Sequence, residues 1–590
     1  MSYEAAVAWS IVRSLLAGVL CWGLARVLCG SFQLSAVSGQ PEKAHRLQPV
    51  GLGPRLRFGL LLLVPFFMPG LVVGYAYRNA SVSLVQTPLL NELLYLAIVV
   101  AQLTPVVVLA LEWLPAAALG SSGAFLLQLA GRSGRRVSWG ERGRAILAGE
   151  LPRQLTAGAI AALLCFQEVE VATLMQASGW AEWIFAKQAG GVELAEVLPF
   201  LVWPVGYGLL LTVPVLGFWM GRQAHRSGEP VGVSPRTESR DPSGGLRPPA
   251  RLLAWSVMAG AWLLVVIWPM VSLALGAFRG VRVIQFRSGL WPEIGDALVL
   301  GVTVTLGLWV ILWSVDRLGR PVSGGRGSRR AATAGGLSHW FSPFCSLSPT
   351  IGSAISEDST VGERGPESIE GKREFAPAAR QEPCPPDDRS RPMSPALAVE
   401  RPAGTGRIAH PTGVQRLALA VLLVPGLLGS LALGLVIFEI CQRIGVQPSY
   451  SPVPLVAAMV LFLLPRALAM QAMLRRNEQQ ARVFLAEGLA QQTGPRGRQG
   501  AAILWRIRDA GRFWTLALLF WWSYLELTLP SLLRPAGMAP APLRLYNFLH
   551  YGHIPGLAAM LVVVLAVPVV LVVVGRGLWI MVDGLSTEDR

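Results

Sequence analysis

Long apolar runs dominate this sequence and decide what it can fold into. Each is about twenty residues or longer, enough for an α-helix rising about 1.5 Å per residue to cross the roughly 30 Å hydrocarbon core of a bilayer. A chain that is 53% hydrophobic and only 15% charged also lacks the polar composition of a water-soluble domain. We therefore predict an all-α polytopic membrane protein with about eleven transmembrane helices, over 6–29, 55–78, 93–118, 154–177, 196–221, 251–278, 295–316, 415–440, 451–474, 511–533 and 554–580.

The arginines of this basic chain, whose formal net charge is +16, gather in alternate loops. The positive-inside rule assigns such loops to the cytoplasm and here leaves the N-terminus outside and the C-terminus in the cytoplasm. Because the positive charge follows the membrane topology, it argues against a nucleic-acid partner. The six cysteines show no C-x-x-C pair or metal spacing, so we expect no disulfide framework. The predicted cytoplasmic loops are 30–54, 119–153, 222–250, 317–414 and 475–510.

An internal repeat relates spans that stand six apart. The second and eighth spans each contain a Pro-Gly pair, and the fourth and tenth each contain a glutamate, Glu168 and Glu526. An even spacing predicts two parallel halves related by an axis along the membrane normal. The expected parts are a first half over 1–221, a linker over 222–250, an extra helix over 251–279 and a second half over 280–590. The Gly-, Ser- and Pro-rich segment 319–411 interrupts the second half and is predicted to be disordered.

Two stretches carry a resemblance to a known family. They read "LPRQLTAGAIAALLCFQEVEVATL" and "YLELTLPSLLRPAGMAPAPLRLYNFLHYGHIPGLAAM", and they resemble the permease subunit of a binding-protein-dependent ABC importer. The second is similar to the ferric-iron and thiamine branch, in which both permease halves are fused. The resemblance implies a type I ABC importer permease fold in the inner (plasma) membrane, two ABC ATPase subunits and an extracytoplasmic solute-binding protein. It covers nearly all spans but not 319–411.

The same resemblance assigns ATPase coupling to the loops 119–153 and 475–510. The family signature there is E-A-A…G…I-x-L-P. Leu151 and Pro152 match its end in the first loop and Gly494 matches its glycine in the second, whereas Arg506 stands where the second L-P would begin. No Walker A sequence and no hydrolase pattern occurs. We therefore expect no enzymatic activity and no cofactor in this chain, with ATP used by the partner ATPase.

Several residues within the spans are candidate functional groups. A carboxylate at membrane depth costs roughly 2.5–3.5 kcal/mol on insertion scales, so Glu168 and Glu526 either line the translocation path or its gate, or cap helix ends outside the hydrocarbon. Glu170 lies at similar depth, and charges such as Arg466 are expected to be peripheral. The two Pro-Gly pairs are candidate hinges or static kinks; they are Pro69, Gly70, Pro425 and Gly426.

The stretch 542–560 is predicted to form a short interfacial helix outside the membrane, with Leu545, Phe548 and Leu549 on one face. We expect it to contact the binding protein through Tyr546, Asn547, His550 and Tyr551. A metal site made from these tyrosines and histidines with His553 is disfavoured, because no carboxylate stands within the segment.

The function expected from the sequence is import of a small solute, with ferric iron as the first expectation and thiamine as the second. An ion-gradient-driven secondary transporter is the alternative, and it would need several buried charges along a midplane relay. A non-transporting membrane scaffold descended from a permease is the third possibility, because the coupling signatures are incomplete.

Overall fold

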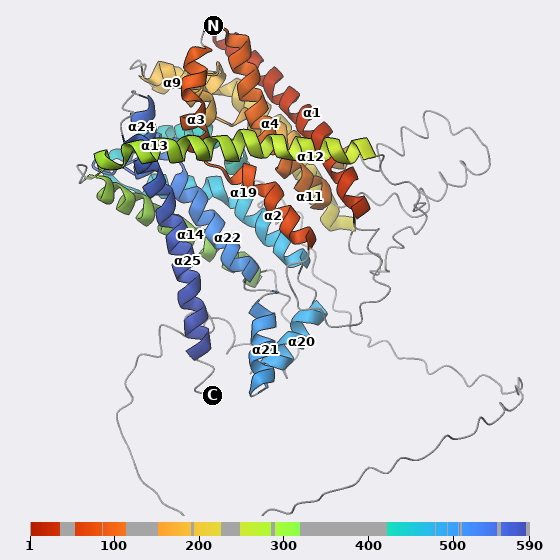
Figure 1. The fold of residues 1–590 in the computed structure, drawn as a ribbon. Helices are drawn as coiled ribbons and strands as arrows, with labels where there is room; N and C mark the ends of the chain where they lie inside the picture. The colour runs from red at the N-terminus through yellow and green to blue at the C-terminus, as the bar shows by residue number, and fades with distance from the viewer. Residues whose placement is uncertain are drawn as a thin grey trace, which may run out of the picture. The chain divides into compact units, whose positions relative to one another are not determined.

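Helices make up the regular structure of the described chain, and no strand occurs among the described residues (Figure 1). The computed structural model describes residues 2–35, 54–84, 86–113, 151–189, 194–225, 248–284, 289–318, 422–477, 480–492, 494–505, 507, 510–550 and 556–585. The predicted insertion 319–411 lies outside these ranges.

The helices of the first half and the helix that follows it are α1 (Tyr3–Ser35), α2 (Pro54–Phe67), α3 (Gly70–Ser83), α4 (Pro88–Trp113), α7 (Leu151–Phe166), α8 (Glu170–Leu174), α9 (Trp180–Ala189), α10 (Leu194–Val197), η1 (Leu198–Leu201), α11 (Val202–His225), α12 (Pro248–Trp262), η2 (Leu263–Ile267) and α13 (Trp268–Ile284). Those of the second half are α14 (Leu290–Leu318), α18 (Ser430–Arg443), η3 (Pro448–Tyr450), α19 (Val453–Asn477), α20 (Gln480–Ala490), α21 (Pro495–Leu504), α22 (Ala510–Leu525), α23 (Thr528–Leu533), α24 (Ala541–His550) and α25 (Leu557–Leu585).

Seven helices of the described chain are long and apolar enough to cross a membrane, and the bent pair α2 and α3 makes an eighth candidate. Helices suit this environment because they satisfy their backbone hydrogen bonds internally. The chain is a multi-pass, all-α membrane protein. The seven spans are Tyr3–Cys29, Pro88–Glu112, Leu198–Gly217, Leu252–Gly280, Leu290–Val315, Val453–Leu474 and Leu557–Gly577.

Four of the eleven predicted spans are not continuous helices. In 55–78, α2 and α3 meet at a 72° bend. In 154–177 the helix stops at Phe166 and resumes at Glu170, and in 511–533 it stops at Leu525 and resumes at Thr528. In 415–440, two residues separate a helical segment over 422–427 from α18. The number of eleven spans stays a prediction.

Two groups of three helices form the packing centres. In the first half α1, α4 and α7 pack against one another, and in the second half α14, α19 and α22 do the same. The short helices that follow each break also pack in matching pairs, α3 on α8 and α18 on α23. Apolar side chains fill these contacts, among them Ala17, Ile98 and Ala161 in the first group and Val304, Met459 and Leu519 in the second.

The helix α12 continues through the π-helical turn η2 into α13, the long yellow-green rod of Figure 1. Its first part packs on α1, α2 and α4, and its last part packs on α3 and α25. The hydroxyl of Tyr77 donates a hydrogen bond of 2.8 Å to the carbonyl oxygen of Leu264 in η2. This rod corresponds to the predicted span 251–278 and touches helices of both halves.

Candidate functional site

A cavity of about 200 Å³ lies where the broken helices of the two halves meet. Pro69 and Gly70 line it from the break between α2 and α3, Glu168 from the break after α7, Glu526 from the break after α22, and Ser430 from the start of α18. The structure thus brings together four interruptions that lie far apart in the sequence.

The break after α7 is organised by Glu168. Its Oε1 accepts a hydrogen bond of 2.9 Å from the backbone N–H of Val171, in the first turn of α8. Val169, which joins the two helices, has φ −110° and ψ −38°. A carboxylate at this position satisfies an N–H that the helix start leaves free.

The break after α22 repeats this geometry. The Oε1 of Glu526 accepts a hydrogen bond of 3.5 Å from the backbone N–H of Leu529, and Leu527 between the helices has φ −109° and ψ −41°. Glu168 and Glu526 therefore cap a helix start and line the cavity at once.

Arg466 from α19 lines the same cavity, and the expectation that it is peripheral is wrong. Its guanidinium lies 4.3 Å from the ring centroid of Phe462 and 5.6 Å from that of Trp522. It shares this cavity with the carboxylates of Glu526, Glu170 and Glu168. The depth of Arg466, near the middle of the span Val453–Leu474, was the sequence signal that could have identified it.

Glu170, which the sequence places at a depth similar to that of Glu168, also lines the cavity. It stands at the start of α8 and faces the α2–α3 break, where a Cβ added to Gly70 would lie 2.8 Å from its Oε2. The glycine thus leaves room for the carboxylate. Three acidic groups and one basic group line this cavity, so its formal charge is negative when all four are ionised.

The two Pro-Gly pairs do not occupy equivalent places. Pro69 precedes α3 at the bend, whereas Pro425 and Gly426 lie inside the segment 422–427, and the break follows at Gly429, whose φ is +91°. A Cβ added to Gly426 would lie only 2.3 Å from the carbonyl oxygen of Leu461, so this glycine allows close contact with α19.

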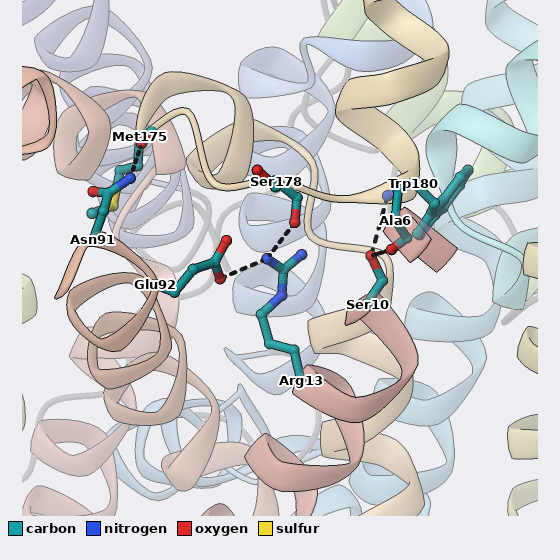
Figure 2. A network of polar contacts seen from close by, with 8 residues as sticks. All are labelled: Ala6, Ser10, Arg13, Asn91, Glu92, Met175, Ser178 and Trp180. Atoms are coloured by element: carbon teal, nitrogen blue, oxygen red, sulfur yellow. Dashed lines mark hydrogen bonds and ion pairs between the residues drawn. The ribbon is translucent and has the colours of Figure 1, made fainter. Parts of the chain in front are cut away.

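An ion pair joins α1 to α4 next to the loop that follows α8. Nη1 of Arg13 on α1 lies 3.0 Å from Oε2 of Glu92 on α4 and donates a hydrogen bond of 3.0 Å to the carbonyl oxygen of Ser178 (Figure 2). The guanidinium also lies 4.7 Å from the ring centroid of Tyr95. One side chain of α1 therefore holds both α4 and the loop.

Further hydrogen bonds hold the two ends of this loop (Figure 2). Nδ2 of Asn91 donates to the carbonyl oxygen of Met175 at 2.8 Å, and the backbone N–H of Trp180 donates to Oγ of Ser10 at 3.1 Å. Burial, with the nearby Glu92 carboxylate, raises the pKa of Glu182 on α9. The network keeps α8 and its Glu170 in a defined position.

The helix α24 overlaps the stretch predicted to be helical, and its Leu545 and Leu549 are buried on one face. Its position at the membrane interface stays a prediction. The hydroxyl of Tyr546 donates a hydrogen bond of 3.1 Å to Oγ1 of Thr173 on α8, so this side chain contacts the interior. Asn547 is half-buried. His550 ends the helix, and Tyr551 and His553 lie outside the described residues.

The predicted coupling residues fall at helix starts. Leu151 and Pro152 begin α7, and Gly494, with φ +82°, directly precedes α21. Arg506 lies outside the described residues. The helices α20 and α21 pack on each other, and Leu485 on α20 is 65% exposed.

Within the described part of the chain, no group of three or more His, Cys, Asp or Glu residues is arranged to hold a metal ion. No family model, curated protein or solved structure matches the chain.

Proposed function

We propose that the chain is the transmembrane permease of an ABC-type importer located in the inner membrane. It moves a small solute, ferric iron as the first expectation and thiamine as the second, delivered by an extracytoplasmic binding protein. Two copies of a separate ATPase subunit supply the energy. The N-terminus lies outside and the C-terminus in the cytoplasm, following the distribution of arginines.

The observation that carries the proposal is the paired interruption of helices around one cavity. Glu168 and Glu526 make the same capping hydrogen bond to the residue three positions on, with nearly equal backbone angles at the break. Discontinuous helices that line a central site are the usual construction of transporters with internal repeats, because irregular backbone is tolerated at membrane depth only where it lines a cavity.

Close helix contacts support two parallel, pseudo-symmetric halves. A Cβ on Gly74 of α3 would lie 2.3 Å from Cδ1 of Leu174 on α8, and one on Gly434 of α18 would lie 2.7 Å from Cδ1 of Leu532 on α23. If Gly74 is aligned with Gly434, Pro65 corresponds to Pro425. The two prolines make matching hydrogen bonds: the backbone N–H of Met68 donates to the carbonyl oxygen of Pro65, and the backbone N–H of Leu428 donates to that of Pro425.

The three-helix groups support the same pairing, with α1, α4 and α7 corresponding to α14, α19 and α22. Eleven spans then form two five-helix halves, 1–221 and 280–590, joined by the linker 222–250 and the extra helix 251–279. Rocking of the halves alternately opens the cavity to each side, which requires only two packings of similar energy.

Charge in the cavity supports a cationic solute. Glu168 and Glu170 come from the first half, whereas Glu526 and Arg466 come from the second. Their mutual interactions therefore change when the halves move, and a cation entering the cavity competes with the guanidinium for the carboxylates.

Coupling runs through the loops 119–153 and 475–510. The second includes the pair α20 and α21, whose Leu485 and Ile503 are exposed apolar side chains. Exposed apolar groups on a short helix pair suit docking into a groove of the ATPase.

Co-purification provides the test. The chain is expressed with candidate ABC ATPase and solute-binding subunits from the same organism, and ATP hydrolysis is measured in proteoliposomes. We expect hydrolysis to rise when loaded binding protein is added, and Leu485→Glu to abolish assembly. Ile444→Glu is the control, because Ile444 is 66% exposed and lies in neither coupling loop. Failure of the assembled complex to import any solute under ATP would refute the proposal.

The buried charges favour one second candidate, an ion-gradient-driven secondary transporter, because such carriers use carboxylates and basic residues at membrane depth. Uptake that survives ATP depletion but is abolished by an uncoupler would support this candidate. A chain that associates with no ATPase and moves no solute under either energy source would instead be a membrane scaffold.

A further inference from the structure

A second cavity, of about 280 Å³, lies between helices of the first half and the extra helix. Leu24 on α1, Leu62 on α2 and Val100 on α4 line one side, whereas Met258 on α12 and Leu264 in η2 line the other. It shares no lining residue with the charged cavity.

The lining of this cavity is apolar, and its few polar groups already have partners. The hydroxyl of Thr104 donates a hydrogen bond of 2.7 Å to the carbonyl oxygen of Val100. The indole Nε1 of Trp262 donates one of 3.0 Å to the carbonyl oxygen of Leu61. A polar ligand would lose its hydration here without gaining hydrogen bonds, so the cavity suits a hydrocarbon.

The cavity is accessible at membrane depth. Ala97 lines it and is exposed. This residue lies nine positions after Pro88, where the span Pro88–Glu112 begins, a rise of about 14 Å along the helix. The surroundings at that depth are lipid chains.

Two arginines in the sequence favour a lipid with an anionic headgroup. Arg57 stands in the first turn of α2, five residues before Leu62, and Arg251 stands in the first turn of α12, six residues before Val257. At about 1.5 Å per residue these arginines stand about 8 Å and 9 Å along the axis from lining residues. Basic residues at helix ends attract anionic headgroups.

We propose that this cavity binds one acyl chain of an anionic phospholipid, held between the first half and the rod α12–η2–α13. The lipid fills an apolar space that would otherwise lack van der Waals contacts, and it stabilises the packing of the extra helix against α1, α2 and α4. The proposal is independent of the solute and of the energy source.

Gly260 provides the test, because it lines the cavity and an added Cβ would meet no atom within 4 Å. Gly260→Phe fills the cavity from within. Gly206→Phe is the matched control, because Gly206 on α11 has equally open surroundings but lines neither cavity. Full-length protein is purified, loaded with palmitoyl-oleoyl phosphatidylglycerol, and examined by native mass spectrometry after detergent exchange.

We expect the wild type and Gly206→Phe to retain one phosphatidylglycerol, and Gly260→Phe to retain about tenfold less, because the phenyl ring takes the space in which the acyl chain would make its contacts. Equal retention by all three would overturn the proposal by showing only lipid on the outer surface. Retention of phosphatidylcholine as strong as that of phosphatidylglycerol would overturn the anionic preference. Ala97→Phe, which fills the cavity from an exposed position, replaces Gly260→Phe if that variant elutes as aggregate in gel filtration.

Discussion

The indole Nε1 of Trp262 donates a hydrogen bond of 3.0 Å to the carbonyl oxygen of Leu61, the carbonyl that Pro65 leaves without its helical donor. Proline has no N–H, so the residue four positions before it loses a hydrogen bond inside a helix. In a membrane that loss must be made good by a neighbour. The extra helix α12 thus supplies the hydrogen-bond donor that the Leu61 carbonyl of α2 lacks because of Pro65.

Trp262→Phe is therefore expected to lower the stability of the protein by about 0.6–1.7 kcal/mol, the range for hydrogen bonds between membrane helices. Thermal unfolding in detergent measures the change. In a Pro65→Ala background the helix supplies its own donor to Leu61, so the same substitution should cost clearly less. An equal cost in both backgrounds would show that the indole contributes by packing alone.

Gly426 is expected to be required for packing of the second half. Its missing Cβ would lie 2.3 Å from the carbonyl oxygen of Leu461 and 2.6 Å from Cδ of Pro465, so Gly426→Ala must displace backbone. We expect a loss of about 1–3 kcal/mol in stability, measured by thermal unfolding. Gly217→Ala, with no atom within 4 Å of the added Cβ, is the control. A variant of unchanged stability but reduced uptake would instead favour a hinge.

Seven of the predicted spans are continuous apolar helices in the described part of the chain, whereas the breaks in the other four were not predicted. Apolar length follows directly from composition, so the helices around Ile98 or Met459 could be placed. The break after Phe166 depends on a glutamate that bonds to a backbone N–H three residues on, and the sequence shows the glutamate but not this bond. The predicted equivalence of the two Pro-Gly pairs is not seen in the structure for a similar reason. The two identical dipeptides stand at different positions relative to the break in each helix.

The cavity could be predicted only in part. Glu168 and Glu526 were identified because charge at membrane depth is costly. The depth of Arg466 in its span gave the same signal, but its neighbours in the cavity are carboxylates from other helices, including Glu170 of the first half, and such proximity is tertiary information.

The pair of Arg13 and Glu92 is expected to be essential for the first half. Their side chains are 6% and 13% exposed, so Arg13→Gln leaves a buried carboxylate without its partner. Removing one member of a buried pair costs about 3–5 kcal/mol, and thermal unfolding should shift accordingly. Arg443→Gln is the control, because the Arg443–Glu439 pair has an arginine that is 76% exposed and should change stability little. A double substitution, Arg13→Gln with Glu92→Gln, should recover part of the loss.

The final prediction separates the two roles of the paired glutamates. Glu168→Gln and Glu526→Gln keep an oxygen that accepts the N–H of Val171 or Leu529, but they remove the charge. We expect each variant to unfold near the wild-type temperature and to import a cationic solute about tenfold more slowly or worse, a change of roughly 1.4 kcal/mol. Glu168→Ala and Glu526→Ala lose the cap as well and should also lose about 1 kcal/mol of stability. Wild-type uptake by both glutamine variants, with loss only in the alanine variants, would mean that these residues act on helix structure and that their charge does not contact the solute.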